Sequence, residues 1–181
     1  MTNIGVYTGL VFQACLLLSA CEKEHAEPLP EKIGDSYQGG IVFFIDVSGK
    51  HGLLAAPTDQ SRSIVWFNGS FLDTGATSLT DGPANTGLII SVHGTGSEYA
   101  ARVCKDFRGG DLTDWYLPAK DELNMLYEQK TVIKNFGNNL YWSSSQYDVG
   151  EIWVQDFETG QQHLDNASDG AGVAVRPIRA Y

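Results

Sequence analysis

The sequence predicts an α+β fold in which short strands at both ends of one domain enclose two helices. Segments rich in β-branched and aromatic residues lie near the start, at residues 37–46, and at the end, at residues 173–181. Apolar residues at helical spacing occur between residues 98 and 129. The chain has 181 residues, 43% of them hydrophobic, with 20 glycines, which favours one core built from many short strands and turns.

A β-hairpin is the first element that the sequence predicts. Residues 37–46 alternate and contain several aromatic and β-branched side chains, residues 47–50 have turn chemistry, and residues 51–57 return as a second strand. Residues 63–67 are a further short strand candidate. Residues 71–95 are rich in Gly, Thr, Ser and Asn, and we expect them to form a long packed or functional loop.

Two helices follow this loop. Over residues 98–107 an apolar face is formed by Ala100, Val103, Cys104 and Phe107, with Ser97 placed to cap its start and a Gly pair to end it. Cys104 is therefore expected to be a small core residue. The second helix covers residues 119–129, with Pro118 before its first turn and a buried stripe formed by Leu123, Leu126 and Tyr127.

The last third is predicted to contain strands at residues 140–144, 152–157 and 161–164. A closing strand at residues 173–181 is expected beside the N-terminal hairpin. These elements would form one twisted antiparallel sheet packed with the two helices.

The N-terminal residues resemble a bacterial lipoprotein signal. Residues 1–20 have no charged side chain, and Leu18-Ser19-Ala20-Cys21 is similar to the lipobox, in which the cysteine is lipidated and becomes the new N-terminus. The sequence thus predicts a signal peptide at residues 1–20, an acidic tether at 21–33 and one domain at 34–181, attached to the outer membrane or cell surface through Cys21. No Lys or Arg precedes the apolar run, which leaves open an ordinary signal peptide or a different start codon.

Charge and cysteine content exclude several classes. The formal net charge of −10 argues against a nucleic-acid partner, because phosphate binding needs clustered Lys and Arg. If residues 1–20 are removed and Cys21 is lipidated, Cys104 is the one cysteine left, so no intrachain disulfide is predicted.

An ordered series of motifs, from about residue 34 to the end, resembles the Lcl C-terminal domain family of bacterial adhesins. The motifs are YQGGIVF at 37–43, HGLLAA at 51–56, TGAT at 74–77, GPANT at 82–86, AARVC at 100–104, DWYLPAKDELN at 114–124, YWSSS at 141–145 and VRPIRAY at 175–181. The resemblance implies a C-type-lectin-like fold and binding of a glycan or protein ligand outside the cell. In some members the interval that corresponds to residues 146–174 is the hypervariable target of a retroelement.

Two departures from lectins concern the ligand. The Glu-Pro-Asn, Gln-Pro-Asp and Trp-Asn-Asp triplets of calcium-dependent lectins are absent, and the acidic charge does not suit sulfated glycans. We predict no cofactor and no metal site, although a cation site could be formed by Asp148, Glu151, Asp156, Asp165 and Asp169.

The candidate binding surface lies in the last third. Strand alternation places Ile152 and Val154 on one face and Trp153 and Gln155 on the other, so Trp153 is exposed if the aliphatic pair is buried. Aromatic rings flanked by hydrogen-bonding groups suit sugars and protein hot spots. The alternative is a core Trp153 with solvated polar neighbours. The predicted ligand-binding residues are Tyr147, Asp148, Glu151, Trp153, Gln155, Asp156, His163, Asp165, Asn166 and Asp169.

No catalytic residues are predicted. The run from Leu72 to Ala76 resembles the catalytic loop of retroviral-type aspartic proteases, but that chemistry needs two carboxylates that share a proton. The spacing of His51, His93 and His163 does not suit a metal site, which favours structural or solvated roles. A subunit of a surface appendage and a lectin-fold or aspartic hydrolase remain as alternatives.

Overall fold

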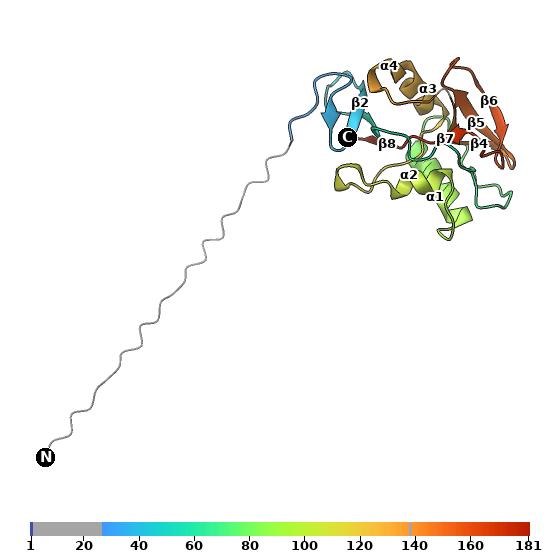
Figure 1. The fold of residues 1–181 in the computed structure, drawn as a ribbon, viewed down its shortest axis with the longest axis horizontal. Coiled ribbons are helices and arrows are strands. Elements are labelled where there is room, and N and C mark those ends of the chain that lie inside the picture. Colours follow the sequence, from blue (N-terminus) through green and yellow to red (C-terminus); the bar gives the residue numbers. More distant parts are fainter. Residues whose placement is uncertain (2–26, 138) are drawn as a thin grey trace.

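The computed structural model describes residue 1, residues 27–137 and residues 139–181 (Figure 1). Within these residues the fold is α+β, with four α-helices and two four-stranded sheets. Residues 2–20 of the predicted signal peptide, Cys21 and residues 22–26 of the predicted tether lie outside the described residues. No helix in the described part of the chain has the length and apolar character that crossing a membrane requires.

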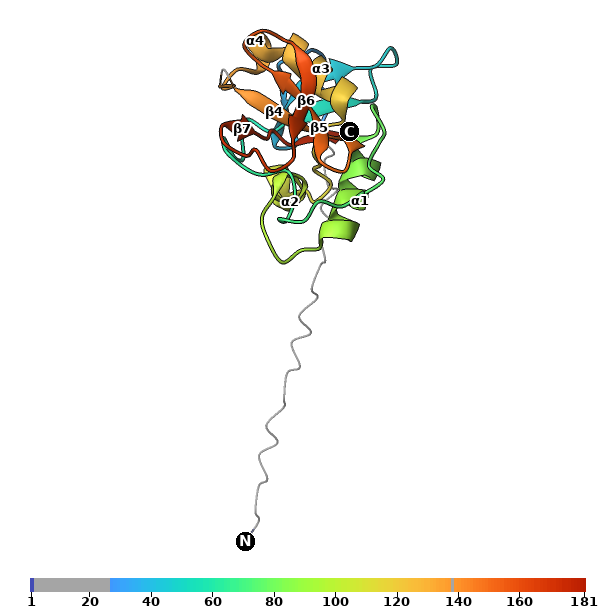
Figure 2. The same ribbon diagram turned by 90° about the vertical axis from the view of Figure 1, so that its right-hand side faces the viewer.

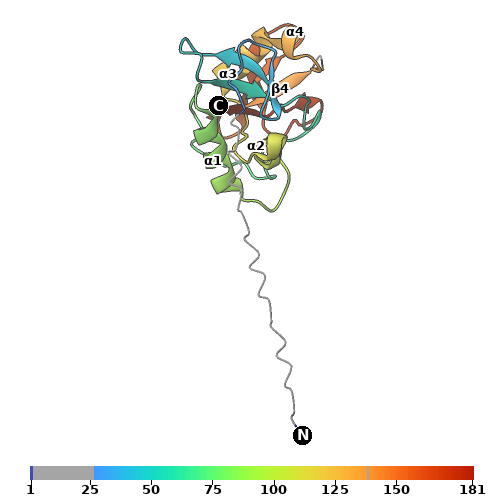
Figure 3. The same cartoon turned by 90° about the vertical axis from the view of Figure 1, so that its left-hand side faces the viewer.

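The first sheet joins the two ends of the domain, as the sequence predicts. Its strands are ordered β1-β2-β3-β8, and all neighbours are antiparallel. Their bounds are Ser36–Tyr37 for β1, Gly40–Ile45 for β2, Gly52–Ala55 for β3 and Ile178–Ala180 for β8. Figure 3 shows β8 ending at the C-terminus beside the N-terminal strands.

The second sheet is formed by the last third and was not predicted as a separate sheet. Its order is β6-β5-β4-β7, with bounds Leu140–Asp148 for β4, Glu151–Asp156 for β5, Gln162–Asn166 for β6 and Val173–Ala174 for β7. Figure 2 faces this sheet. The β7 strand runs parallel to β4, whereas the other pairs are antiparallel.

The prediction of one continuous closing strand and one sheet is therefore wrong. The chain leaves the second sheet after Ala174 and enters the first at Ile178. Between them, the Val175 amide donates to the Ser61 carbonyl, and Pro177 has no amide hydrogen for a ladder. This segment is thus the connection between the two sheets.

Two of the helices agree with the prediction. The α2 helix covers Ala100–Asp106 and α3 covers Lys120–Glu128, close to the expected ranges. Cys104 is buried on α2, as predicted. The expected Ser97 cap is wrong, because Tyr99 precedes the first turn and no side chain caps it.

The sequence analysis missed α1, at Gly82–His93, and α4, at Lys130–Ile133. For α1 the start signal is present: the Asp81 carboxylate accepts a hydrogen bond from the Ala84 amide at 3.0 Å, and Pro83 lies in the first turn. The Gly, Thr and Asn residues around it hid this signal, because they are typical of loops.

The strand predicted at residues 63–67 is also wrong, although Trp66 and Phe67 are buried. Backbone groups of this segment bond to three separate places: the Ile64 and Trp66 amides donate to the carbonyls of Val173 and Ala167, and the Val65 carbonyl accepts from Ala100. Hydrophobic burial alone therefore produced the strand-like pattern.

Indole groups connect this segment to the second sheet. The Trp66 Nε1 donates to the Ser143 carbonyl at 2.9 Å, and the Trp142 Nε1 donates to the Ile64 carbonyl at 2.7 Å. Both rings are fully buried in one core that also contains residues of α1 and α2. This packing fixes the core-facing side of β4 and β5.

A buried ion pair holds the connection between the sheets. Arg176 and Asp59 have side chains that are 0% and 1% exposed, and the guanidinium Nε donates to Asp59 Oδ1 at 2.8 Å. Arg176 also donates to the carbonyls of Ala56 and Asn135, at 3.0 and 2.7 Å. The Tyr141 hydroxyl donates to Asp59 Oδ2 at 3.0 Å. The guanidinium therefore joins the segments at residues 56–59 and 135 to the connection at residue 176, and Asp59 adds Tyr141.

We expect Asp59→Asn to lower the free energy of unfolding by about 3–5 kcal/mol, because it leaves a buried guanidinium without its counter-charge. Urea unfolding measures this loss. The matched control is Asp106→Asn, which breaks the exposed 2.7 Å ion pair with Arg102 and should cost less than about 1 kcal/mol. Equal effects of the two substitutions would contradict this role of Asp59.

Candidate ligand-binding surface

The register of β4, β5 and β6 decides which predicted site residues share a face. Residues paired across antiparallel strands point to the same side of the sheet. Trp153 pairs with Leu164 and Glu151 with Asn166, so these side chains share one face. Ile152 pairs with Asp165 and Val154 with His163, on the opposite face, where both aliphatic residues enter the core.

Trp153 lies between the two outcomes considered from sequence, because its side chain is partly buried and partly exposed. The Lys120 Nζ of α3 lies 4.9 Å from the Trp153 ring centroid, a cation–π geometry. Tyr147, which is 62% exposed, approaches the same ring edge-on, with centroids 6.3 Å apart. These three side chains form what we call the aromatic patch.

Gln155 does not belong to the exposed surface, contrary to the expectation from alternation. Its side chain is fully buried because α3 covers this end of the strand. The Gln155 Nε2 donates to Asn124 Oδ1 at 2.8 Å and to the Gly160 carbonyl at 3.1 Å, and its Oε1 accepts from Gln162 at 3.3 Å. Its role is to attach α3 and the β5–β6 turn to the sheet.

Several predicted acidic and amide residues make local turn contacts. The Asp148 carboxylate accepts from the Val149 amide, the Asp165 carboxylate from the Asn166 amide, and the Asn166 Oδ1 from Ser168. Glu151, His163 and Asp169 are exposed. Among the described residues, no group of three or more His, Cys, Asp or Glu side chains has the geometry of a metal site.

Asp156 shapes the turn after β5. Desolvation acts to raise the pKa of Asp156, but hydrogen bonds from the Glu158 amide and from Thr159 outweigh it and hold that pKa below its usual value. The carboxylate is therefore bound within its own turn.

Exposed apolar residues that sequence analysis missed surround the β4–β5 turn. Phe71 is 50% exposed, Leu72 41% and Val149 40%, and with Tyr147 they form what we call the hairpin tip. The loop residues are held there because buried Gln146 accepts from the Thr74 amide at 2.9 Å and donates to the Leu72 carbonyl at 3.0 Å. The sequence does contain a signal for this surface, because Phe71 and Leu72 are two large apolar residues in an otherwise polar loop.

Hydroxyl and carboxylate groups that could serve as nucleophiles or acids have structural partners. Ser143 Oγ donates to the Trp153 carbonyl at 2.7 Å, and Ser145 Oγ donates to the Ser78 carbonyl at 2.7 Å. The Asp73 carboxylate accepts from the Gly75 amide at 2.9 Å, within its own loop. Burial raises the pKa of the Cys104 thiol well above its usual value.

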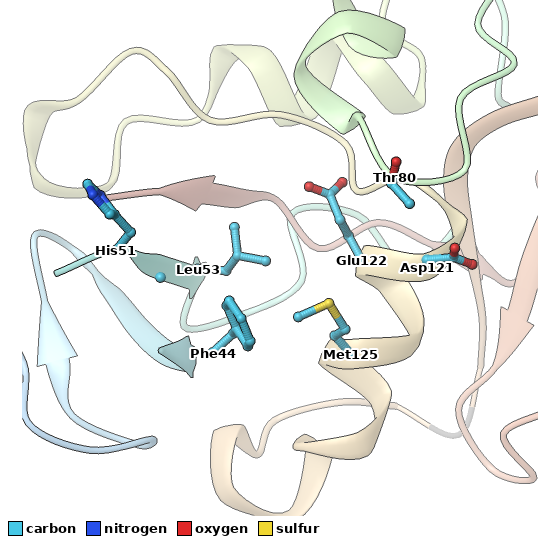
Figure 4. Close-up of a pocket in the computed structure, with 8 residues that line it drawn as sticks. Phe44, His51, Leu53, Thr80, Asp121, Glu122 and Met125 are labelled. Atoms are coloured by element: carbon cyan, nitrogen blue, oxygen red, sulfur yellow. The ribbon is translucent and has the colours of Figure 1, made fainter. Parts of the chain in front are cut away.

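A pocket of about 410 Å³ lies between the first sheet and α3, apart from the aromatic patch (Figure 4). Phe44, Leu53 and Met125 form its apolar part, His51 lies at one end, and the Glu122 carboxylate lies at the other, near Thr80. Burial raises the pKa of Glu122. Its carboxylate nevertheless serves as a helix cap, because it accepts from the amides of Gly82 and Ala119 and from the Tyr116 hydroxyl, at 3.1, 2.8 and 3.0 Å.

His93 supports the loop that carries the hairpin tip. It is 5% exposed, at the end of α1, and packs edge-on against Trp66, Phe67 and Tyr99. Its Nδ1 lies 3.2 Å from Asn68 Oδ1, and its carbonyl accepts from the Asn68 side chain at 2.8 Å. Desolvation by this burial lowers the pKa of His93.

The comparisons with known proteins add no relative. No protein-family model matches the chain, and no curated protein matches it at a significant level.

We expect the free energy of unfolding to fall as pH decreases below about 6.5, because the unfolded chain binds a proton at His93 before the folded chain does. The stabilisation is complete above the unfolded pKa and is lost toward the lower, folded pKa. Urea unfolding between pH 7.5 and 5.5 should show a smaller loss in His93→Gln, which cannot ionise. Parallel losses in the two proteins would disprove the link.

Proposed function

We propose that this chain is a lipid-anchored protein of the bacterial cell exterior that binds a glycan or protein ligand through the aromatic patch and the hairpin tip. The anchor rests on the lipobox-like Leu18-Ser19-Ala20-Cys21. The finer fold proposal, a C-type-lectin-like domain of the Lcl C-terminal type, is supported by the order of the sequence motifs and by the pairing of the C-terminal β8 with β3.

The observation that carries the binding proposal is the partly exposed Trp153 ring, which contacts both Lys120 and Tyr147. The exposed part of an indole presents a flat apolar contact area, and a nearby ammonium adds a hydrogen-bond donor. Trp153 is part of a strand with both neighbours buried, so little conformational entropy is lost when a ligand binds.

The hairpin tip favours a protein as the ligand. Phe71, Leu72, Tyr147 and Val149 expose apolar surface around one turn, and such grouped side chains are typical of protein contact sites. The aromatic patch alone would also suit a sugar ring. The interval 146–174, which the family resemblance marks as hypervariable in some members, contains Tyr147, Val149 and Trp153.

Screening the chain on arrays of glycans and of surface proteins tests the proposal. We expect Trp153→Ala to lower the affinity for the bound ligand by about tenfold or more, which corresponds to about 1.4 kcal/mol or more of binding free energy. The matched control is Phe44→Ala, which removes an aromatic side chain that is 37% exposed on the first sheet. The proposal fails if Trp153→Ala keeps full affinity or if Phe44→Ala loses as much.

Lipid attachment is tested separately. Cells that express the chain and are fed an alkyne-labelled fatty acid should label the wild-type protein in the membrane fraction, whereas Cys21→Ser should remain unlabelled because the thioether cannot form. Cys104→Ser is the control, since Cys104 is buried in the domain. Labelling that persists in Cys21→Ser would remove the anchor from the proposal.

A further inference from the structure

A groove of about 420 Å³ lies between α1 and α2, away from the aromatic patch. The two helices pack side by side (Figures 1 and 3). Apolar groups of Pro83, Gly87, Ile90 and Tyr116 line the groove, together with Arg102 and Lys105 of α2. This volume is within the range of small-molecule sites.

Gly87 is the first observation that points to a ligand. It lies in the interior of α1, where glycine costs about 1 kcal/mol relative to alanine. Neither sterics nor backbone conformation explains it: a Cβ at this position would meet no atom within 4 Å, and its φ is not in the left-handed region. The effect of the glycine is to leave helix backbone bare on the groove, where a ligand can approach closely.

The groove walls are held in place without a ligand. Thr86, the residue before Gly87, accepts at its Oγ1 from the Leu117 amide at 3.1 Å and donates to the Leu117 carbonyl at 3.3 Å. Both residues are buried. These hydrogen bonds fix the distance between α1 and Tyr116 on the other side of the groove, so the groove is preformed.

Charge is the second observation. Among the residues that line the groove, Arg102 and Lys105 are cations and Asp114 is the carboxylate, in a chain of net charge −10. The Arg102 Nε is bound to Asp106 at 2.7 Å, which leaves its two terminal nitrogens for another acceptor. Asp114 is bound by Arg179 at 2.8 Å through each carboxylate oxygen, and those hydrogen bonds lower its pKa. Lys105 Nζ donates once, to the Thr113 carbonyl at 3.1 Å, which leaves ammonium hydrogens for another acceptor.

We propose that this groove binds a small amphipathic carboxylate, with its apolar body against Gly87, Ile90 and Tyr116 and its carboxylate at Arg102 and Lys105. Guanidinium and ammonium donors form their strongest hydrogen bonds with such an anion. The site is independent of the surface proposed for the macromolecular ligand, so either proposal can fail alone.

Octanoate is the probe, compared with octylammonium and 1-octanol on the full chain by NMR titration of the Ile90 methyl groups. We expect saturable binding of octanoate, at least about tenfold tighter than of octylammonium. Gly87→Leu fills the groove and should lower the affinity for octanoate by about tenfold or more. Its melting temperature should stay equal or rise, because leucine is a better helix former than glycine. Ser91→Leu, exposed on α1 outside the groove, should bind octanoate as the wild type does.

The charged end is tested by Arg102→Gln and Lys105→Gln, each of which should weaken octanoate and leave 1-octanol unchanged. Lys50→Gln, in the exposed β2–β3 turn, is the control for net charge. The proposal is overturned if octanoate does not saturate at millimolar concentration, if octylammonium binds equally well, or if Gly87→Leu keeps wild-type affinity.

Discussion

The contact between Arg176 and Asp59 is the constraint on which the arrangement of the two sheets depends. Between β7 and β8 the chain crosses from one sheet to the other, and the side chain of Arg176 is fully enclosed at this crossing. Its guanidinium has partners on the segment after β3 and on the segment before β4. A hydrophobic residue could fill the same volume, but it could not satisfy the carbonyls of Ala56 and Asn135.

From this constraint the position of the candidate surface follows. Tyr141 at the start of β4 bonds to Asp59, and Trp142 and Trp66 hold the middle of the strand against the core. The far end of β4 then projects with β5 as the hairpin that carries Tyr147 and Trp153. Residues 141–146 of β4 are buried, and the exposed side chains of β4 are at its C-terminal end, at Tyr147 and Asp148.

Sequence patterns were sufficient where local signals agreed with burial. The hairpin of β2 and β3, the helices α2 and α3 and the β3–β8 neighbourhood all follow from periodicity and turn residues. The α1 helix was hidden because Gly82, Thr86 and Gly87 are poor helix formers, and tertiary bonds of Asn85 and Thr86 compensate for them. Alternation placed Trp153 and Gln155 on one face correctly, but it could not reveal that α3 buries Gln155 fully and Trp153 only in part. Lys120 and Phe71 reach the surface from distant segments, and no local pattern records such contacts.

The order of the strands also has a consequence for how the domain is made. Both sheets receive a strand from the last nine residues, since β7 pairs with β4 and β8 with β3. While a ribosome or a translocation channel still holds those residues, neither sheet is complete and Asp59 lacks its buried partner Arg176. Both sheets are therefore incomplete until residues 173–180 have left the ribosome or the channel, and a chain in this incomplete state can be threaded through a narrow pore.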